Sequence, residues 1–446
     1  MRGSLWILIA SLTWMACSEP PPPRNLVLIV LDSIRADRLS SYGYPLQTSP
    51  HLDSLAAEGV LFEINVSNSS STLPSMAGLF AGDYPKRDVF DNRLKRSLVE
   101  KIRAAGIRTA AFVGGGSISK RFGFERGFDY FRESDGEDAT VSLEETFANA
   151  ATWIRQNYSE RFFLVIHSNE PDLPYWRQDY TKGLDSGHLG ETFEKVDAAK
   201  VRSGQLEFGA SERIWLSALY DAGLNASDLE VGKLLETLKQ LGIQEQTAVV
   251  VTSGHGGDLG GRHPEWPGSH GHNLYDESLL VPLIIYDPSR DYPVQRVTTQ
   301  IRTIDTLPTV LDLLGLPLQQ QILGQTLVPV MDGSEAGHRI AWSTVERSKT
   351  SLPEHPKRFA LRSGTHKLIV TPRPRGRLLL ELYDLASDPG ERSNTAETQP
   401  KLRVQLFKAL INFRDALRRA GVARYPLDAN HAGGASEPLR NLDNSE

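Results

Sequence analysis

The sequence predicts an α/β fold in which a central sheet carries helices on both faces. Several short runs are apolar with no alternation of polar and apolar residues, which is typical of strands buried on both faces. Segments with helical periodicity lie between these runs, and alternation of strands with helices favours a sheet with crossover helices. At 446 residues and 40% hydrophobic composition, the chain can bury a large core.

The predicted elements follow in order along the chain. The predicted strands are NLVLIVL (25–31), TAAFV (109–113), FFLVI (162–166), TAVVV (247–251) and LVPLIIY (280–286). The predicted helices cover residues 48–59, 94–106, 142–154 and roughly 225–241. The first helix has Pro50 at its start and Gly59 as its stop, and the third opens with a capping box of Ser142 and Glu145. The start and stop signals of these helices therefore agree with their helical periodicity.

The pattern changes near residue 338, where antiparallel strands replace the α/β alternation. One amphipathic helix, LRVQLFKALINFRDALRRAG (402–421), follows these strands. We therefore predict a main α/β domain over residues 25–335 and a smaller C-terminal subdomain over residues 336–425. Residues 426–446 are mostly polar or small and predict a disordered tail.

The N-terminus has the pattern of an export signal. Arg2 precedes the apolar run LWILIASLTWMA (5–16), which is too short to span a bilayer as a helix. The only cysteine, Cys17, follows this run at the place where a lipoprotein signal is cut and lipidated. Residues 18–24, SEPPPPR, then form an extended tether. We expect an exported protein that a lipid on Cys17 anchors in the bacterial envelope, in the periplasm or at the outer membrane. An ordinary cleaved signal with a chance cysteine is the alternative.

The charge balance bears on the class of partner. The chain has 49 basic and 55 acidic residues and a net charge of −6. This balance gives no electrostatic reason to expect a nucleic-acid partner.

Polar side chains follow several predicted strands. Asp32 follows the first strand, His167 follows the strand at 162–166, and Gly254 and His255 follow the strand at 247–251. Ligands of open α/β sheets bind at the carboxyl ends of the strands. We therefore expect these side chains to meet at one place.

A hydroxyl-bearing loop precedes a further predicted helix in STLPSMAGLFAG (71–82). Thr72 lies just before Pro74, which is a favoured first residue of a helix. Backbone N–H groups and the helix dipole favour negative charge at this position. Thr72 is therefore a candidate nucleophile toward a sulfate or phosphate centre, especially beside a metal cation.

Several segments resemble, in the same order, the sulfatase family of the alkaline-phosphatase superfamily. They are NLVLIVLDSIRADRLSSYGY, TLPSMAGLFAGDYP, SGHGGDLG, HGHNLYDESLLVPLIIY and ELYDLASDPGERSN. The resemblance covers roughly residues 25–400. It implies a doubly wound mixed sheet, a smaller C-terminal antiparallel α+β subdomain, and a divalent metal that carries the nucleophile at a helix N-terminus.

The resemblance also implies roles for individual residues. Asp32 matches the first metal carboxylate of the family, and Thr72 stands where the family places its cysteine or serine. His255 matches the histidine of an Asp-His-Gly motif, and His272 matches a basic residue ahead of LYDE. Asp32, His255 and Thr72 are therefore the predicted metal ligands.

The nucleophile motif departs from the family pattern. Typical sulfatases oxidise a Cys or Ser in Cys-x-Pro-Ser-Arg to formylglycine, but oxidation of Thr72 would give a ketone, so no formylglycine is expected. Met76 also replaces the arginine of the motif. Threonine is the direct nucleophile in the phosphodiesterase and phosphoethanolamine-transferase relatives, so Thr72 is compatible with activity.

The metal site departs from the family pattern as well. Gly254 replaces the aspartate of Asp-His-Gly, Ser33 replaces a second aspartate after the first strand, and Asp172 replaces a histidine that contacts the substrate or leaving group. A hard cation such as calcium or magnesium requires several anionic oxygens, whereas zinc accepts nitrogen and oxygen in low coordination number. Asp258 or Asp172 are possible substitute ligands.

Two functional hypotheses follow. In the first, the protein hydrolyses or transfers a sulfate or phosphate ester of a small molecule or glycan, with Thr72 as nucleophile and His272 or His167 as the acid for the leaving oxygen. In the second, a catalytically impaired member of the family serves as a binding or scaffold module at the cell envelope. The replacements at Gly254, Ser33 and Asp172 favour the second hypothesis.

Overall fold

The computed structural model describes residues 24–85, 93–115, 117–133, 142–262, 264, 266–293, 295–318, 322–345 and 357–419. The predicted signal over residues 1–17 with Cys17, all of the tether except Arg24, and the tail over residues 426–446 lie outside this part of the chain. No helix in the described residues is long and apolar enough to cross a membrane.

The main sheet contains the five predicted strands and four more. They are β1 (Asn25–Leu31), β2 (Val60–Val66), β3 (Arg108–Val113), β4 (Tyr130–Arg132), β5 (Phe162–Ser168), β6 (Thr247–Thr252), β7 (Leu280–Tyr286), β8 (Arg296–Val297) and β9 (Ile301–Arg302). The order across the sheet is β4-β3-β5-β1-β6-β7-β2-β8, with β9 also paired to β2. Strand β7 runs antiparallel to both of its neighbours, β6 and β2, so the sheet is mixed.

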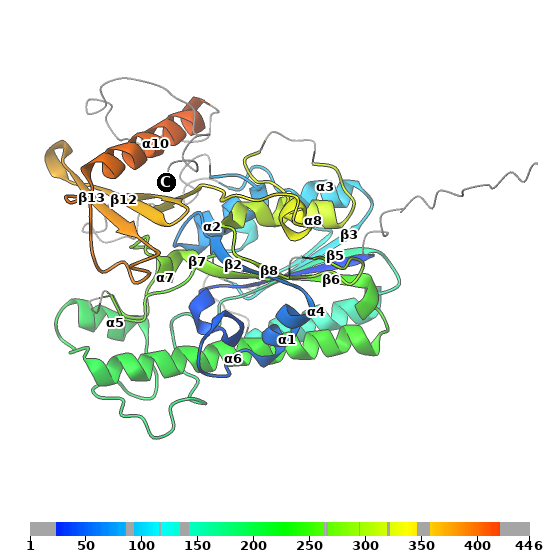
Figure 1. The fold of residues 1–446 in the computed structure, drawn as a ribbon. Coiled ribbons are helices and arrows are strands. Elements are labelled where there is room, and N and C mark those ends of the chain that lie inside the picture. The colour runs from blue at the N-terminus through cyan, green and yellow to red at the C-terminus, as the bar shows by residue number, and fades with distance from the viewer. Residues whose placement is uncertain are drawn as a thin grey trace, which may run out of the picture.

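Helices cover both faces of this sheet (Figure 1). One face packs on α1 (Pro50–Glu58), α4 (Leu143–Asn157) and α6 (Ala210–Gln240). The other face packs on α2 (Thr72–Ala81), α3 (Val99–Ala104), α8 (Thr306–Leu313) and α9 (Val328–Met331). Successive β1 residues alternate between the two apolar clusters, which explains why its sequence is apolar without alternation. The doubly wound architecture is confirmed.

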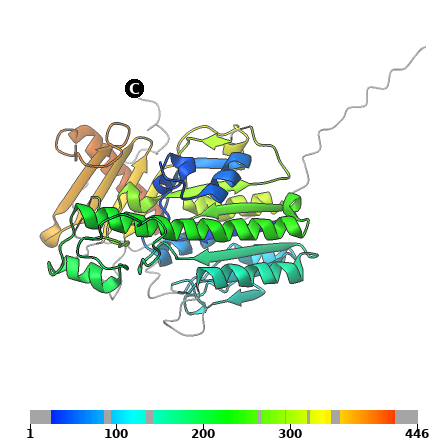
Figure 2. The ribbon, with the colours of Figure 1, turned by 90° about the horizontal axis from the view of Figure 1, so that it is seen from below.

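Helix α6 begins earlier than its sequence predicts. The prediction placed the start near residue 225, whereas the helix starts at Ala210. Gly223 lowers the helix propensity of the missed part. In the fold, Gly223 packs beside the loop after β5, and a Cβ atom there would lie 3.5 Å from the backbone of Glu170 and Pro171, an ordinary van der Waals contact. Figure 2 shows α6 running along the molecule beside the sheet.

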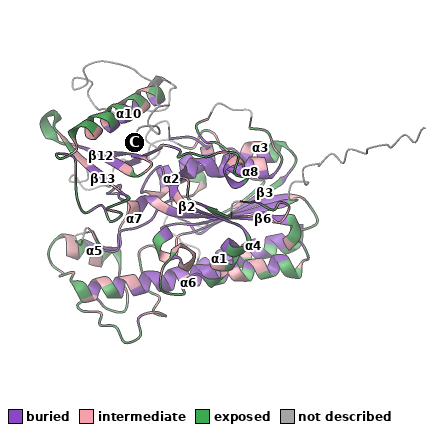
Figure 3. Cartoon of the chain, viewed as in Figure 1, coloured by how far each residue is buried: buried purple, intermediate pink, exposed green. Residues whose placement is uncertain are grey.

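A separate antiparallel sheet follows the main one. It contains β10 (Ala341–Val345), β11 (Arg358–Ser363), β12 (His366–Pro372) and β13 (Leu378–Asp384) in sequential order. Helix α10 (Pro400–Arg419) packs on β11 and β12 through an apolar cluster that includes Trp342 and Leu410. The outer side of α10 is exposed, as expected for an amphipathic helix (Figure 3). The predicted C-terminal antiparallel α+β structure is confirmed.

Several short helices lie in the connections between these elements. Helix α5 (Lys195–Arg202) lies in the long connection between β5 and α6. Helix α7 (Asp276–Leu279) immediately precedes β7. The two short 3-10 helices after β1 are η1 (Ala36–Arg38) and η2 (Ser40–Tyr42).

Candidate active site

The candidate site lies where neighbouring parallel strands end. Strand β1 pairs in parallel with β5 on one side and with β6 on the other. Asp32 follows β1, His167 lies near the end of β5, and His255 follows β6. Strand β2 points in the same direction as β6 because each is antiparallel to β7, so α2 begins at the same edge of the sheet. This topology brings Thr72, the first residue of α2, to the other three side chains.

Thr72 and His255 form the central contact. Thr72 Oγ1 lies 2.9 Å from His255 Nε2. His255 Nδ1 lies 2.7 Å from the carbonyl oxygen of Gly256. A carbonyl oxygen can only accept, so this contact assigns the proton of the neutral ring to Nδ1. Nε2 is then an acceptor, and the Thr72 hydroxyl donates to it.

A buried carboxylate lies beside this pair. Asp32 Oδ1 accepts a hydrogen bond from the backbone N–H of Gly254 at 3.2 Å. Asp32 Oδ2 lies 3.5 Å from His255 Nε2 and 3.7 Å from His167 Nε2. Burial alone would raise the pKa of Asp32, but the neighbouring His255 and His167 lower it well below its usual value. Asp32 is therefore an anion that can stabilise a protonated His255.

His270 and Asp172 extend the site. The rings of His255 and His270 are stacked, with their centroids 4.3 Å apart and an interplanar angle of 26°. His270 Nε2 lies 3.3 Å from Asp172 Oδ2. Burial lowers the pKa of His255. Burial would also lower the pKa of His270, but the Asp172 carboxylate raises it above its usual value. Two adjacent imidazoles with oppositely shifted pKa values suit a base and an acid.

His272 and Asp258 belong to a neighbouring group. His272 Nε2 lies 3.7 Å from Asp258 Oδ2, and the His272 ring stacks on Trp266 with centroids 5.3 Å apart. Asp258 Oδ1 accepts a hydrogen bond from the N–H of Gly260 at 2.7 Å. The roles predicted for His272 as an acid and Asp258 as a substitute ligand stay predictions. The resemblance to the family pointed to His272. The imidazole that stacks on His255 belongs instead to His270, the first histidine of the segment His270-Gly271-His272.

The donor set does not fit a calcium or magnesium ion. These cations bind several oxygen ligands, but Asp32 is the one carboxylate among the predicted metal ligands. Its Oδ1 already accepts a hydrogen bond from the N–H of Gly254. A Cβ atom at Gly254 would lie 2.6 Å from Asp32 Oδ1 and 2.8 Å from Ser75 Oγ, so the space for a second carboxylate is filled. No group of three or more His, Cys, Asp or Glu in the described residues is arranged to hold a metal ion. Metal ligation by Asp32, His255 and Thr72 stays a prediction.

Some polar atoms of the site lack protein partners. Asp32 Oδ2 and both ring nitrogens of His167 are buried with no hydrogen-bond partner among the described residues. Buried polar atoms normally have a partner, so these atoms mark a place that suits a polar ligand or water.

The doubly wound mixed sheet and the contact between Thr72 and His255 at its strand ends agree with the alkaline-phosphatase superfamily. The family model for Sulfatase matches residues 24–316, and the model described as N-sulphoglucosamine sulphohydrolase, C-terminal, matches residues 268–416. The chain belongs to the sulfatase family.

Individual relatives agree with this assignment. Arylsulfatase K of Xenopus laevis is 24% identical over 464 residues, covering 90% of this chain and 84% of the relative. N-acetylgalactosamine-6-sulfatase of Canis lupus familiaris is 28% identical over 375 residues, covering 75% of this chain and 70% of the relative.

Solved structures confirm the fold. The phosphonate monoester hydrolase of Agrobacterium radiobacter superimposes with a TM-score of 0.70 at 19% identity, covering 88% of this chain and 96% of that one. The protein BT4656, solved in complex with its substrate D-glucosamine-2-N,6-O-disulfate, also gives a TM-score of 0.70 at 19% identity, covering 90% and 98%.

Proposed function

We propose that the protein hydrolyses a sulfate ester with Thr72 as the nucleophile and His255 as its base. The observation that carries this proposal is the 2.9 Å contact between Thr72 Oγ1 and His255 Nε2 at the first residue of α2. Membership of the sulfatase family supports the reaction class. The start of the ten-residue helix α2 supports the binding of an anionic group, because free N–H groups and the helix dipole favour negative charge there.

The first step transfers the sulfuryl group to the protein. Thr72 Oγ1 forms a bond to sulfur, and the bond between sulfur and the ester oxygen breaks. The hydroxyl proton passes to His255 Nε2, and the Asp32 carboxylate 3.5 Å away stabilises the resulting imidazolium. His270, paired with Asp172, is the proposed donor of a proton to the leaving alcohol. His167 and His272 are the alternatives for that role.

The second step releases the product. The oxygen of a water molecule bonds to sulfur as the Thr72 Oγ1–sulfur bond breaks. His270, neutral after the first step, takes up one proton of this water, and the proton on His255 returns to the threonine oxygen. An acceptor alcohol in place of water would make the protein a transferase. A phosphate ester would react by the same bond changes at phosphorus. Because the Thr72 hydroxyl attacks sulfur directly, this mechanism requires no formylglycine.

A divalent metal could assist the same reaction by neutralising charge on the sulfuryl oxygens. Zinc accepts nitrogen ligands, so Asp32, His255 and Thr72 are the candidates to hold it. Because the donor set does not fit a hard cation, the two proposed steps require only the substrate, water and groups of the chain. Metal content of the purified protein tests this part of the proposal separately.

Turnover by the full chain tests the proposal. Aryl sulfate, aryl phosphate monoester and aryl phosphodiester substrates are compared for the wild type, Thr72→Ala and Thr72→Ser. We expect sulfate turnover that falls at least a hundredfold in Thr72→Ala and is partly retained in Thr72→Ser, since serine keeps the hydroxyl. Equal rates for the wild type and Thr72→Ala would contradict the nucleophile assignment.

A catalytically impaired binding module at the envelope is the second candidate function. The observation that favours it is the filled space beside Gly254, which leaves Asp32 without a second carboxylate. This candidate predicts that the wild type and Thr72→Ala bind a sulfated glycan equally and turn over no ester. The turnover measurements therefore separate the two functions.

We also propose that the protein is exported and anchored through a lipid on Cys17. The apolar run at 5–16 that ends at this cysteine supports the proposal. Mass spectrometry of the N-terminal peptide from envelope fractions tests it. A mature chain that begins with diacylated Cys17 is expected, whereas an unmodified N-terminus at another residue would contradict the anchor.

A further inference from the structure

The turn after β1 has a strained backbone conformation. Ser33, which directly follows Asp32, has a φ of 64°. This left-handed region is uncommon for residues other than glycine, because the Cβ atom crowds the backbone there. A side chain that hydrogen-bonds its own backbone can offset the strain, but Ser33 Oγ is buried with no hydrogen-bond partner among the described residues. Groups from other elements therefore hold this turn.

Two buried hydroxyl groups bind the backbone of the turn. Tyr220 Oη on α6 donates to the carbonyl oxygen of Ser33 at 2.9 Å and accepts the N–H of Arg35 at 2.9 Å. Ser253 Oγ, in the segment after β6, accepts the N–H of Ile34 at 3.2 Å. Tyr220 and Ser253 are both fully buried, so the loss of either hydroxyl leaves backbone groups of the turn without a partner.

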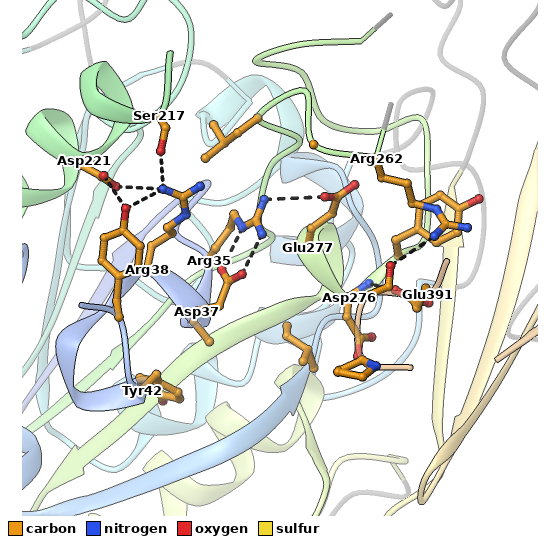
Figure 4. A pocket seen from close by; sticks show the side chains of 18 of the residues that line it. Arg35, Asp37, Arg38, Tyr42, Ser217, Asp221, Arg262, Asp276, Glu277 and Glu391 are labelled. Atoms are coloured by element: carbon orange, nitrogen blue, oxygen red, sulfur yellow. Dashed lines mark hydrogen bonds and ion pairs between the residues drawn. The ribbon is translucent and has the colours of Figure 1, made fainter. Parts of the chain in front are cut away.

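The chain that follows the turn borders a cavity of about 1350 Å³. Arg35 lines this cavity, and so do Arg213 on α6 and Arg392 after β13. Figure 4 shows the Arg35 side chain directed toward Asp37 and Glu277, whose carboxylates lie 2.7 and 3.7 Å from its guanidinium nitrogens. Because the cavity leaves this stretch without packing on one side, its conformation depends strongly on hydrogen bonds.

The same groups join the turn to the segment that carries His255. Ser253 Oγ donates to the carbonyl oxygen of His255 at 2.7 Å, and Arg35 Nη1 donates to that of Gly257 at 3.1 Å. Tyr220 holds the turn from helix α6. Burial raises the pKa of Tyr220, so its hydroxyl keeps the proton that it donates. The turn is therefore fixed between α6 and the segment after β6.

From these contacts we infer that Tyr220 is a positioning residue, whose hydroxyl holds the turn after β1 and so sets the place of Asp32 beside His255. The inference rests on the proposed function, in which the Asp32 carboxylate, 3.5 Å from His255 Nε2, stabilises the imidazolium. Tyr220 acts on the reaction only through the turn. The imidazolium forms only when Thr72 gives up its proton, so displacement of Asp32 should lower kcat rather than raise KM.

Kinetics of the full-chain Tyr220→Phe variant test this inference. Phenylalanine keeps the ring, whose centroid lies 6.1 Å from that of Tyr175, and removes only the hydroxyl. With 4-nitrophenyl sulfate we expect kcat to fall about 10- to 100-fold and KM to stay within about twofold, since small displacements of catalytic groups cost rates of this order.

Tyr42→Phe is the matched control. Tyr42 Oη also donates to a carbonyl oxygen, that of Phe62, and also accepts an N–H, that of Leu283, both at 3.0 Å. These bonds reach β2 and β7 rather than the turn, so kcat should stay within about twofold of the wild type. Thermal melts confirm that the variants are folded at the assay temperature. An equal fall of kcat in both tyrosine variants would overturn the inference.

Substitution of Ser33 separates the turn from any other effect of Tyr220. Glycine adopts the left-handed region without strain, so the turn of Ser33→Gly depends less on Tyr220. Tyr220→Phe should therefore reduce kcat less in the Ser33→Gly background than in the wild type, by a factor of about three or more. Equal reductions in the two backgrounds would contradict a role through the turn.

Crystal structures of the wild type and Tyr220→Phe give a readout that does not need turnover. We expect residue 33 to leave the left-handed region. We also expect the distance from Asp32 Oδ2 to His255 Nε2 to exceed 3.5 Å by about 0.5–1 Å. Either an unchanged turn or an unchanged distance would refute the inference. A wild type that turns over no ester would refute the proposed function alone, and the two structures would still decide whether Tyr220 positions Asp32.

Discussion

A Cβ atom at Gly254 would lie 2.6 Å from Asp32 Oδ1, because the Asp32 carboxylate occupies the space beside this glycine. The same carboxylate oxygen accepts the N–H of Gly254 at 3.2 Å. The absence of a side chain at residue 254 and the position of Asp32 are therefore coupled. A carboxylate cannot be added at residue 254 without displacing the first one.

Substitution at Gly254 should destabilise the fold. Gly254→Ala forces its Cβ against Asp32 and Ser75, which we expect to lower the free energy of unfolding by about 1–3 kcal/mol. Gly257→Ala is the matched control, because a Cβ atom there meets no atom within 4 Å and its φ is not positive. Urea denaturation of both variants measures the difference.

Gly254→Asp extends this test to metal binding. We expect no gain of stoichiometric calcium or magnesium, because the added carboxylate and Asp32 compete for one space. Elemental analysis with calorimetric titration of the purified variant measures this. Tight calcium binding with unchanged stability would show that the site adapts and that our account of Gly254 is wrong.

The role of His270 can be tested by varying the leaving group. If His270 protonates the leaving oxygen, His270→Gln should reduce kcat by about 10²–10⁴ for alkyl sulfates, which have poor leaving groups. The reduction should be much smaller for 4-nitrophenyl sulfate, whose leaving oxygen needs little protonation. Asp172→Asn should show the same trend, since Asp172 lies 3.3 Å from His270 Nε2. An equal reduction for all leaving groups would indicate a structural role instead.

Lys367 connects the two sheets through buried charges. Its Nζ lies 2.5 Å from Asp276 Oδ1 on α7 and 2.8 Å from Glu391 Oε1, and the side chain is fully buried. Lys367→Met leaves these carboxylates without this cation, and we expect a loss of about 3–5 kcal/mol in unfolding free energy. Lys408→Met at an exposed position of α10 is the control. Stability that stays within 1 kcal/mol of the wild type would contradict this assignment.

The strand ends of the site could be predicted from the sequence because each depends on a local signal. Asp32, His167 and His255 follow apolar runs, and Thr72 precedes a proline-marked helix start, so the rule for parallel strands brings them together. The pairing of His270 with Asp172 could not be predicted in this way. It depends on how the long loops after β5 and β6 fold against each other, and those loops lack periodicity.

The cavity depends even more on tertiary structure. Arg213 on α6 and Arg392 after β13 are far apart in the sequence, and each alone resembles an ordinary solvated charge. Only the packing of the antiparallel sheet against α7 brings them to one wall. The positions of the strands along the chain follow from local patterns, whereas the charges that meet in a cavity follow from packing that those patterns do not encode.

Asp228 should make stability depend on pH. This α6 residue accepts the N–H groups of His51 and Leu52 at the start of α1, at 3.0 and 2.8 Å. Burial raises its pKa from 3.8 to about 6, because the hydrogen bonds compensate only part of the desolvation. A raised carboxyl pKa favours the folded state below the unfolded pKa, and this advantage is lost as the pH rises through about 6.

The variant Asp228→Asn isolates this contribution, since asparagine keeps an oxygen acceptor but does not ionise. The unfolding free energy of the variant relative to the wild type should therefore increase between pH 4.5 and 7.5, by about 2 kcal/mol. Urea denaturation at several pH values measures the difference, and other titrating groups cancel because both proteins contain them. A difference that stays constant across this range would mean that Asp228 remains ionised in the folded protein, with its charge stabilised by the start of α1.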